Sequence, residues 1–255
     1  MTTQELQAAL TMPQFPISAK YDAEWIMENQ MGPCAIWLLE FLMEKMTLKP
    51  GMRVLDMGCG MGMTSIFLAK EYGVTVFAND LWIQATDNYK RFKDAGLEDK
   101  IFPIHADARA LPYAEGYFDA IVAIDSYFYF GTDAFYLDYF SKFIKDDGQI
   151  GIVYPALTRE FENGGNVPSY MMPFWNWSMY GYHSPEWWAR LWSIFQHIEV
   201  EVSDLLPNGY DVWLHWEKIR HSLSGGGKRD DYKLLEVDNG NYLSFGRTVG
   251  RKFRN

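Results

Sequence analysis

Residues 53–80 read RVLDMGCGMGMTSIFLAKEYGVTVFAND and decide the fold of this chain. A short apolar strand pattern comes first, and a turn that contains Gly58, Gly60 and Gly62 leads into a helix pattern and a second strand. Glycine allows a sharp bend and lets a ligand approach where a Cβ would clash. The start of the following helix offers unpaired N–H groups to polar ligand atoms. The stretch therefore predicts a strand–turn–helix–strand unit with a nucleotide site.

The residues around the turn narrow the class of nucleotide. A phosphate-binding P-loop would end in Gly-Lys-Ser/Thr, and no lysine follows Gly62 directly. The glycines run G-x-G-x-G rather than G-x-G-x-x-G, and Asp56 stands two residues before Gly58. A carboxylate at that point would repel a pyrophosphate. It suits a cationic group instead, such as an amino-acid ammonium, reached directly or through water.

Asp80 ends the second strand pattern. Its carboxylate can accept two hydrogen bonds from the 2′- and 3′-hydroxyls of a ribose, which predicts a ribose-binding role. Leu81 and Trp82 follow and could pack beside an adenine. A solvated turn is the alternative interpretation of Asp80.

The run Asp56-Met-Gly58-Cys-Gly60-Met-Gly62 resembles the first motif, D/E-x-G-x-G-x-G, of the class I S-adenosylmethionine-dependent methyltransferases. The resemblance runs from about Pro33 to the C-terminus. Within that superfamily, the sequence is similar to the small-molecule and lipid-quinone C-methyltransferases and to the cyclopropane fatty-acid synthases. The resemblance implies S-adenosylmethionine as the cofactor and a small-molecule methyl acceptor.

The resemblance also implies further site residues and a fold. Asp107 matches the family's acidic residue that accepts a bond from the adenine amino group, and Ala108 matches the residue whose backbone N–H bonds the ring. The expected fold is a doubly wound, Rossmann-like α/β sheet of seven strands with helices on both faces. The sheet is mostly parallel, and the last strand runs antiparallel between the fifth and the sixth.

The chain divides into three predicted parts. Residues 1–32 form an N-terminal arm or partial lid, and residues 33–255 form the cofactor-binding domain. Residues 155–185 interrupt the regular alternation with a long aromatic-rich insertion. Such an insertion is typical of a lid or pocket wall. A separate apolar cluster or the interface of a homodimer is the alternative.

The residues after the fourth strand are expected at the reaction centre, because ligands of open parallel sheets lie beyond the carboxyl ends of the strands. Asp125 is predicted to contact the cofactor and, with Tyr127, Tyr129 and His183, to form the catalytic set. Methyl transfer requires a nucleophile placed about 3 Å from the methyl carbon, and aromatic faces attract the sulfonium. If the acceptor must lose a proton, the able bases are Asp125, His183 and Glu160.

The composition narrows the partners and the compartment. A net charge of −10 over 255 residues disfavours binding to nucleic acid. Two cysteines, no basic-plus-apolar leader and no long apolar run favour a cytoplasmic protein without stable membrane insertion. The five histidines show no metal-ligand spacing, so no metal is expected.

Three functional classes remain open from the sequence. A small-molecule methyltransferase is favoured, because Asp56, Asp80 and Asp107 all fall at the ends of predicted strands. A nicotinamide-dependent oxidoreductase shares the sheet but should bind a pyrophosphate poorly beside Asp56. A module that binds S-adenosylmethionine without catalysis is the third.

Overall fold

The computed structural model describes residues 1–224 and 231–253. The glycines of the predicted flexible stretch Ser224-Gly225-Gly226-Gly227 lie outside the described residues.

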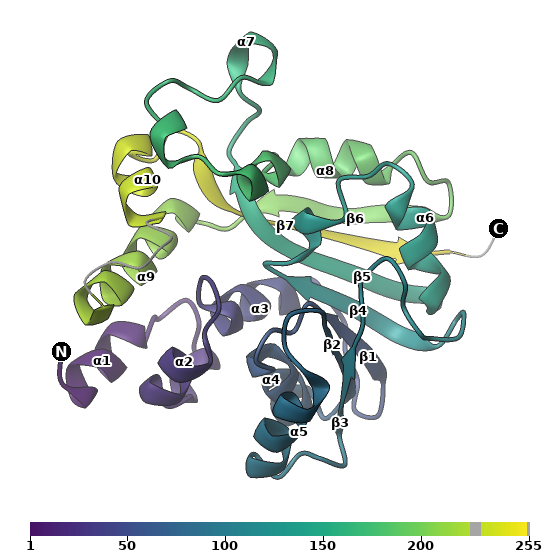
Figure 1. The fold of residues 1–255 in the computed structure, drawn as a ribbon. Helices are drawn as coiled ribbons and strands as arrows, with labels where there is room; N and C mark the ends of the chain where they lie inside the picture. Colours follow the sequence, from purple (N-terminus) through teal and green to yellow (C-terminus); the bar gives the residue numbers. More distant parts are fainter. Residues whose placement is uncertain (225–230, 254–255) are drawn as a thin grey trace.

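Within the described residues, seven strands form one sheet in the order β3-β2-β1-β4-β5-β7-β6 (Figure 1). The strands are β1 (Arg53–Met57), β2 (Thr75–Asp80), β3 (Ile101–His105), β4 (Phe118–Ile124), β5 (Ile144–Leu157), β6 (Ile198–Leu205) and β7 (Leu243–Lys252). β1 to β5 pair in parallel, and β7 lies antiparallel between β5 and β6. The doubly wound, seven-stranded α/β fold with an antiparallel last strand is thereby confirmed.

Helices lie on both faces of this sheet. The α-helices are α1 (Thr3–Leu10), α2 (Ala23–Asn29), α3 (Ala35–Met43), α4 (Met63–Tyr72), α5 (Ala85–Asp94), α6 (Tyr136–Phe140), α7 (Glu162–Gly165), α8 (Pro185–Trp192), α9 (Gly209–Ser224) and α10 (Asp231–Asp238). Short 3-10 turns are η1 (Ser18–Lys20), η2 (Tyr127–Tyr129), η3 (Ser141–Phe143), η4 (Met172–Phe174) and η5 (Trp177–Gly181). In Figure 1, α8 lies above the sheet and α3 and α4 lie below it.

Two glycines show how closely the helices approach the sheet from opposite sides. A Cβ at Gly151 of β5 would lie 3.0 Å from a methyl group of Leu42, in α3. A Cβ at Gly250 of β7 would lie 3.1 Å from the ring of Trp192, in α8. Gly151 is paired with Val249, so Gly250, the next residue along β7, points to the other face.

α3 is apolar on nearly every side, as expected of a helix that is buried all round. Its buried residues include Ile36, Trp37, Leu38, Leu39, Phe41 and Leu42. Trp37 stacks on Phe15 of the N-terminal arm at 5.7 Å between ring centroids and meets Trp216 of α9 edge-on at the same distance. α3 therefore joins the sheet to the N-terminal arm and to α9.

The first 19 residues differ from the expected mobile polar arm. They contain α1, whose start is closed by a capping box between Thr2 and Glu5. Leu6 and Leu10 are buried, and α1 packs on α2 and α9. The two apolar side chains, four residues apart, supply the packing face that the polar composition concealed.

The segment before the fifth strand is also corrected. The sequence pattern predicts a helix from Phe135 to Ile144 and a terminating turn over residues 145–148. α6 ends at Phe140, and β5 already begins at Ile144, which pairs with Phe118 of β4. The register between β4 and β5 shifts after this pair, because the next pair is Ala120 with Gln149, and Asp147 has a left-handed φ of 66°. The polar residues of the predicted turn therefore form an irregularity within β5.

Candidate functional site

The turn after β1 adopts a backbone that favours glycine at three positions. Gly58, Gly60 and Gly62 have φ values of 74°, 54° and 80°, all in the left-handed region. A Cβ at Gly58 would lie 2.4 Å from the Cβ of Ser126, and one at Gly62 would lie 2.3 Å from the ring of Phe92. The predicted glycine turn is confirmed, and Gly62 caps the start of α4.

Asp80 fixes this turn from the neighbouring strand. One carboxylate oxygen, Oδ2, accepts a hydrogen bond from the backbone N–H of Gly60 at 2.8 Å. The other, Oδ1, accepts from the backbone N–H groups of Trp82 at 2.7 Å and Ile83 at 2.9 Å. Only 6% of Asp80 is exposed, so it is not the solvated turn residue of the alternative interpretation. These hydrogen bonds use part of the acceptor capacity of Asp80 to hold the turn after β1 and the loop after β2 in place. The remaining acceptor capacity is available to a ligand.

Asp56 lies beneath the turn rather than on the cavity wall. Its Oδ2 accepts hydrogen bonds from the hydroxyls of Thr64 and Ser65, both at 2.6 Å, which ties β1 to the first turn of α4. Its Oδ1 is buried and has no hydrogen-bond partner in the described part of the chain. Burial raises the pKa of Asp56 to about 6, although the two hydroxyls act in the opposite direction. Because Asp56 does not line the cavity, its position does not favour direct contact with a ligand ammonium. Contact through water remains a prediction.

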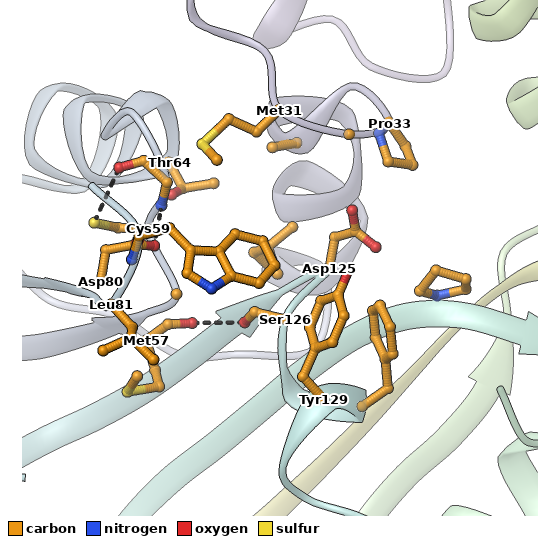
Figure 2. Close-up of a pocket in the computed structure, with 18 of the residues that line it drawn as sticks. Met31, Pro33, Met57, Cys59, Thr64, Asp80, Leu81, Asp125, Ser126 and Tyr129 are labelled. Carbon is orange, nitrogen blue, oxygen red and sulfur yellow. Dashed lines mark hydrogen bonds between the residues drawn. The ribbon is translucent and has the colours of Figure 1, made fainter. Parts of the chain in front are cut away.

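A cavity of about 450 Å³ opens at the carboxyl ends of β1, β2 and β4. Figure 2 shows Cys59, Asp80 and Leu81 to one side, Asp125 and Tyr129 to the other, and Met31 and Pro33 above. The cavity thus brings together most of the residues predicted for the site, namely Gly58, Gly60, Asp80, Leu81, Asp107, Ala108, Asp125 and Tyr129. Gly62 and Asp56 do not line the cavity and lie behind the residues that form its wall.

Asp107 and Ala108 line the end of the cavity that lies beyond β3. Asp107 forms an ion pair with Arg109, whose Nη2 donates to Oδ2 at 2.6 Å and whose Nε donates to Oδ1 at 2.9 Å. These bonds lower the pKa of Asp107 to about 2. Asp107 is therefore a carboxylate at neutral pH and a hydrogen-bond acceptor.

Asp125 has an unusual backbone for a residue other than glycine, with φ at 51°. Its backbone N–H donates to the carbonyl of Val153 at 2.8 Å, so the end of β4 holds it in place. A Cβ at Gly32 would lie 2.4 Å from its Oδ2, so the segment before α3 passes directly over the carboxylate. Non-glycine residues in this region of φ tend to occur at functional sites.

Aromatic rings form a continuous wall beside Asp125. Tyr129 contacts Trp82 edge-on at 5.4 Å between centroids and Phe128 at 4.2 Å. The series continues from Phe128 to Tyr182 at 5.3 Å and from Tyr182 to Trp213 at 6.3 Å. All five rings line the cavity, and together they connect the two sides of its mouth.

Residues 155–185 contribute three residues to the cavity, Pro155, Trp177 and Tyr182. Trp177 is 74% exposed and lies 6.2 Å from the ring of Tyr129. Trp175, two residues earlier, packs away from the cavity against Phe161. The segment is therefore part of the cavity wall through these three residues.

Two residues of the predicted catalytic set lie elsewhere. Tyr127 is completely buried behind the wall, where its ring packs between Trp188 and Trp192 of α8. His183 stacks on Trp187 at 3.7 Å, and its Nδ1 pairs with Glu160 at 3.0 Å. Neither Tyr127, His183 nor Glu160 lines the cavity, so the structure corrects their predicted contact with the reacting groups.

The sequence interpretation missed the contribution of α9. Trp213 and Arg220 both line the cavity. Their separation of seven residues places them on one helical face, which is a signal that the sequence contains. The sequence contains no sign, however, that this face meets the cavity. Within the predicted partial lid of residues 1–32, Asn29 lines the cavity, whereas Tyr21 packs on Phe67 at 5.4 Å between ring centroids.

Among the described residues, no three His, Cys, Asp or Glu side chains gather in a way that could hold a metal ion. In the same part of the chain, no helix combines the length and apolar character needed to cross a bilayer.

The known proteins that resemble the chain include the following three. The methyltransferase GfsG of Streptomyces halstedii is 41% identical over 90 residues, which span 35% of this chain and 32% of that protein. Geranyl diphosphate C-methyltransferase of Streptomyces coelicolor A3(2) superposes with a TM-score of 0.70 at 16% identity, covering 96% of this chain and 86% of that one. Phosphoethanolamine N-methyltransferase 2 of Haemonchus contortus superposes with a TM-score of 0.72 at 16% identity, covering 100% and 60%.

The matched part of the chain thus spans about a third of GfsG, and the two structural likenesses concern the fold. The glycine turn, Asp80 and Asp107 all lie inside the region that matches a family model, which extends over residues 30–164 and includes more than half of the 255 residues. The chain belongs to the family described as mycolic acid cyclopropane synthetase.

Proposed function

We propose that this protein binds S-adenosylmethionine in the cavity and transfers its methyl group to a small-molecule acceptor. The observation that carries the proposal is the convergence of the glycine turn, Asp80 and Asp107 on one cavity, at the ends of three adjacent strands. Similarity to GfsG and membership of the family support the same activity.

Each part of the cofactor has suitable partners on the cavity wall. The left-handed turn from Gly58 to Gly62 leaves room for the amino-acid portion beside the start of α4. Asp80 would accept hydrogen bonds from the ribose hydroxyls, because its bonds to backbone N–H groups leave part of its acceptor capacity unused. Leu81 would pack beside the adenine, while Asp107 would accept from its amino group and the backbone N–H of Ala108 would bond the ring.

The cofactor would supply an electrophilic methyl group on a positively charged sulfur. The chain would then position the acceptor and exclude water, since in-line displacement depends mostly on placement. The rings of Tyr129 and Trp177 offer faces to positive charge, an attraction worth about 0.5–2 kcal/mol per ring. Asp125 is the carboxylate of the predicted catalytic set, and it lines the cavity.

We assign each of the two predicted lids, residues 1–32 and residues 155–185, to particular residues of the cavity wall. Residues 1–32 would act as a partial lid through Asn29 and Met31, both of which line the cavity. Residues 155–185 would close the acceptor side through Trp177. Met31 also lies against the turn, because a Cβ at Gly60 would come within 2.9 Å of its sulfur.

The net charge and the two cysteines support the proposed cellular compartment and disfavour one class of partner. Cys34 and Cys59 are both buried free thiols, which suits a reducing cytoplasm. The net charge of −10 opposes a nucleic-acid partner. The exposed aromatic side chains of residues 155–185, such as Tyr170 and Tyr180, would suit a homodimer interface.

Calorimetry distinguishes the proposed cofactor from a nicotinamide dinucleotide. S-Adenosylhomocysteine should bind one-to-one, whereas the pyrophosphate of a dinucleotide would meet the carboxylates of Asp80, Asp107 and Asp125. Tight dinucleotide binding without a response to S-adenosylhomocysteine would overturn the assignment. Labelled methyl transfer to a panel of metabolites then separates an enzyme from a non-catalytic binding module.

A further inference from the structure

We infer that Asn88 is a positioning residue for the cofactor: by holding the carbonyl of Gly60, it sets the affinity of the glycine turn for the amino-acid portion of S-adenosylmethionine. The inference rests on the proposed function and deepens it, because it names a residue outside the cavity that orders the turn for its ligand. Asn88 belongs to α5 and does not line the cavity.

Asn88 is a buried polar residue on a largely exposed stretch of helix. Only 1% of it is exposed, whereas its neighbours Asp87, Tyr89 and Lys90 are exposed. Asparagine inside a helix costs stability relative to alanine, because its amide can bond to the backbone in other conformations. Burial adds a desolvation cost unless the amide is hydrogen-bonded. The burial of Asn88 therefore needs a compensating partner outside α5.

The side-chain amide supplies that partner by joining α5 to the turn. Nδ2 of Asn88 donates to the carbonyl of Gly60 at 2.9 Å and lies 3.6 Å from Sγ of Cys59. Oδ1 accepts from Nη1 of Arg91 at 3.0 Å. Because a guanidinium group can only donate, its bond to Oδ1 turns the NH₂ group of the amide toward Gly60. Arg91 therefore orients the amide, and the amide holds the turn.

Gly60 is held at both of its backbone groups. Its N–H donates to Oδ2 of Asp80 at 2.8 Å, and its carbonyl accepts from Asn88. The two partners come from different segments, the end of β2 and α5, so together they fix the peptide groups on either side of Gly60. Gly60 lines the cavity, so a ligand meets the backbone that these bonds hold. A turn that is already ordered loses less conformational freedom when its ligand binds.

The effect of Asn88 should be confined to one portion of the cofactor. The amino-acid portion is proposed to lie beside the turn, whereas the adenosine portion is proposed to contact Asp80, Leu81 and Asp107. The bonds of Asp80 to the backbone N–H groups of the loop after β2 do not involve Asn88. The contacts to adenosine should therefore survive a change of Asn88, which a general structural role would not predict.

Two ligands that share the adenosine and the sulfur test this difference. 5′-Methylthioadenosine ends in a methyl group where S-adenosylhomocysteine continues into its amino-acid portion. Calorimetry gives the dissociation constants of both for the full chain and its variants. Asn88→Ala should weaken S-adenosylhomocysteine binding about tenfold, because the carbonyl of Gly60 loses a buried hydrogen bond, and 5′-methylthioadenosine binding less than about threefold. Equal weakening for the two ligands, or none, would overturn the inference.

Two further variants identify the group that acts. Asn88→Asp keeps the size and the acceptor for Arg91 but presents an oxygen to the carbonyl of Gly60. At about pH 8 it should weaken S-adenosylhomocysteine binding at least as much as Asn88→Ala, and an unchanged affinity would refute the donor role. Asn241→Ala is the matched control, because its Nδ2 also donates to a backbone carbonyl, that of Asp238 at 2.6 Å, and it does not line the cavity. The control should leave both affinities unchanged.

A variant at Arg91 covers the case in which Asn88→Ala does not fold. Alanine favours a helix more than asparagine does, so α5 should persist, and urea unfolding checks this. Arg91→Leu leaves Asn88 in place at the turn but releases the orientation of its amide. It should weaken the binding of S-adenosylhomocysteine severalfold and that of 5′-methylthioadenosine hardly at all. Unchanged S-adenosylhomocysteine affinity in Arg91→Leu would contradict the inference.

The same experiments separate the two proposals. If the unaltered protein and Asn88→Ala bind S-adenosylhomocysteine equally well, the role of Asn88 is refuted and the proposed function is left intact. If the unaltered protein binds neither ligand, the proposed function is refuted. Hydrogen exchange at the Gly60 amide then decides whether Asn88 holds the turn: faster exchange in Asn88→Ala supports this, and equal exchange contradicts it.

Discussion

The backbone N–H of Gly60 donates to Oδ2 of Asp80 at 2.8 Å, which joins the turn after β1 to the end of β2. Asp80 thereby has two tasks, one in shaping the turn and one in the proposed contact with ribose. Oδ1 is also bonded to the backbone N–H groups of Trp82 and Ile83. Removing the carboxylate should therefore affect both loops as well as the ligand.

Asp80→Ala should weaken S-adenosylhomocysteine binding by about 1–3 kcal/mol, because hydrogen bonds to a charged acceptor are among the stronger ones. Asp80→Asn retains one acceptor oxygen and should lose less. Calorimetry measures both affinities, and circular dichroism checks that the fold is intact. Unchanged affinity in a folded Asp80→Ala protein would remove the ribose role.

Gly58→Ala should reduce cofactor affinity by more than tenfold and destabilise the fold. The new Cβ would lie 2.4 Å from Ser126, in addition to the left-handed strain of about 1–2 kcal/mol. Gly96→Ala is a matched control, since Gly96 has φ at 68° and open space where a Cβ would go. In urea unfolding, the Gly96→Ala control should lose only the part of the free energy of unfolding that corresponds to the left-handed strain. Equal effects of the two substitutions on cofactor binding would argue against a role for close approach at Gly58.

Asp56 should give the stability a specific pH dependence. Burial raises its pKa to about 6 in the native state, above the usual value near 3.8 expected when unfolded. Between about pH 4 and pH 6 the native state then binds more protons, so the contribution of Asp56 to the free energy of unfolding falls as the pH rises, by at most about 3 kcal/mol.

Asp56→Asn tests this dependence, because an amide keeps an acceptor for Thr64 and Ser65 but does not titrate. The variant should gain stability relative to the native sequence as the pH rises from 4 to 6, with no further change above that range. Urea unfolding at several pH values measures the difference. Parallel curves for the two proteins would show that Asp56 titrates normally.

Trp177→Ala should impair methyl transfer to the acceptor while leaving S-adenosylhomocysteine affinity within about threefold, because Trp177 lines the cavity on the side that we propose for the acceptor. Phe135→Ala is the matched control, an aromatic residue that is 80% exposed and does not line the cavity. Steady-state kinetics and calorimetry give the two quantities. A loss of cofactor affinity equal to the loss of activity would place Trp177 on the cofactor instead.

The glycine turn could be predicted because it depends on local pattern, whereas the place of the last strand was implied by the resemblance to the methyltransferases. β4 is almost wholly apolar, as expected of a strand covered on both faces, and the turn requires glycine for its backbone alone. Asp80 and Asp107 could be placed because each follows a strand at the same edge of the sheet.

Side-chain direction could not be predicted in the same way. Tyr127 and Tyr129 lie in one 3-10 turn, yet Tyr127 points into the core against Trp188 and Tyr129 into the cavity. Which of the two is buried depends on α8, some sixty residues later in the sequence. His183 is likewise drawn away from the cavity by stacking on Trp187 of that helix.

A crystal structure of the protein with S-adenosylhomocysteine tests the central claim most directly. The account predicts the ribose hydroxyls within hydrogen-bond distance of Asp80, the adenine beside Leu81 and Asp107, and the sulfur facing Asp125 and Tyr129. A ligand bound outside this cavity, or bound in it with its ribose remote from Asp80, would contradict the account.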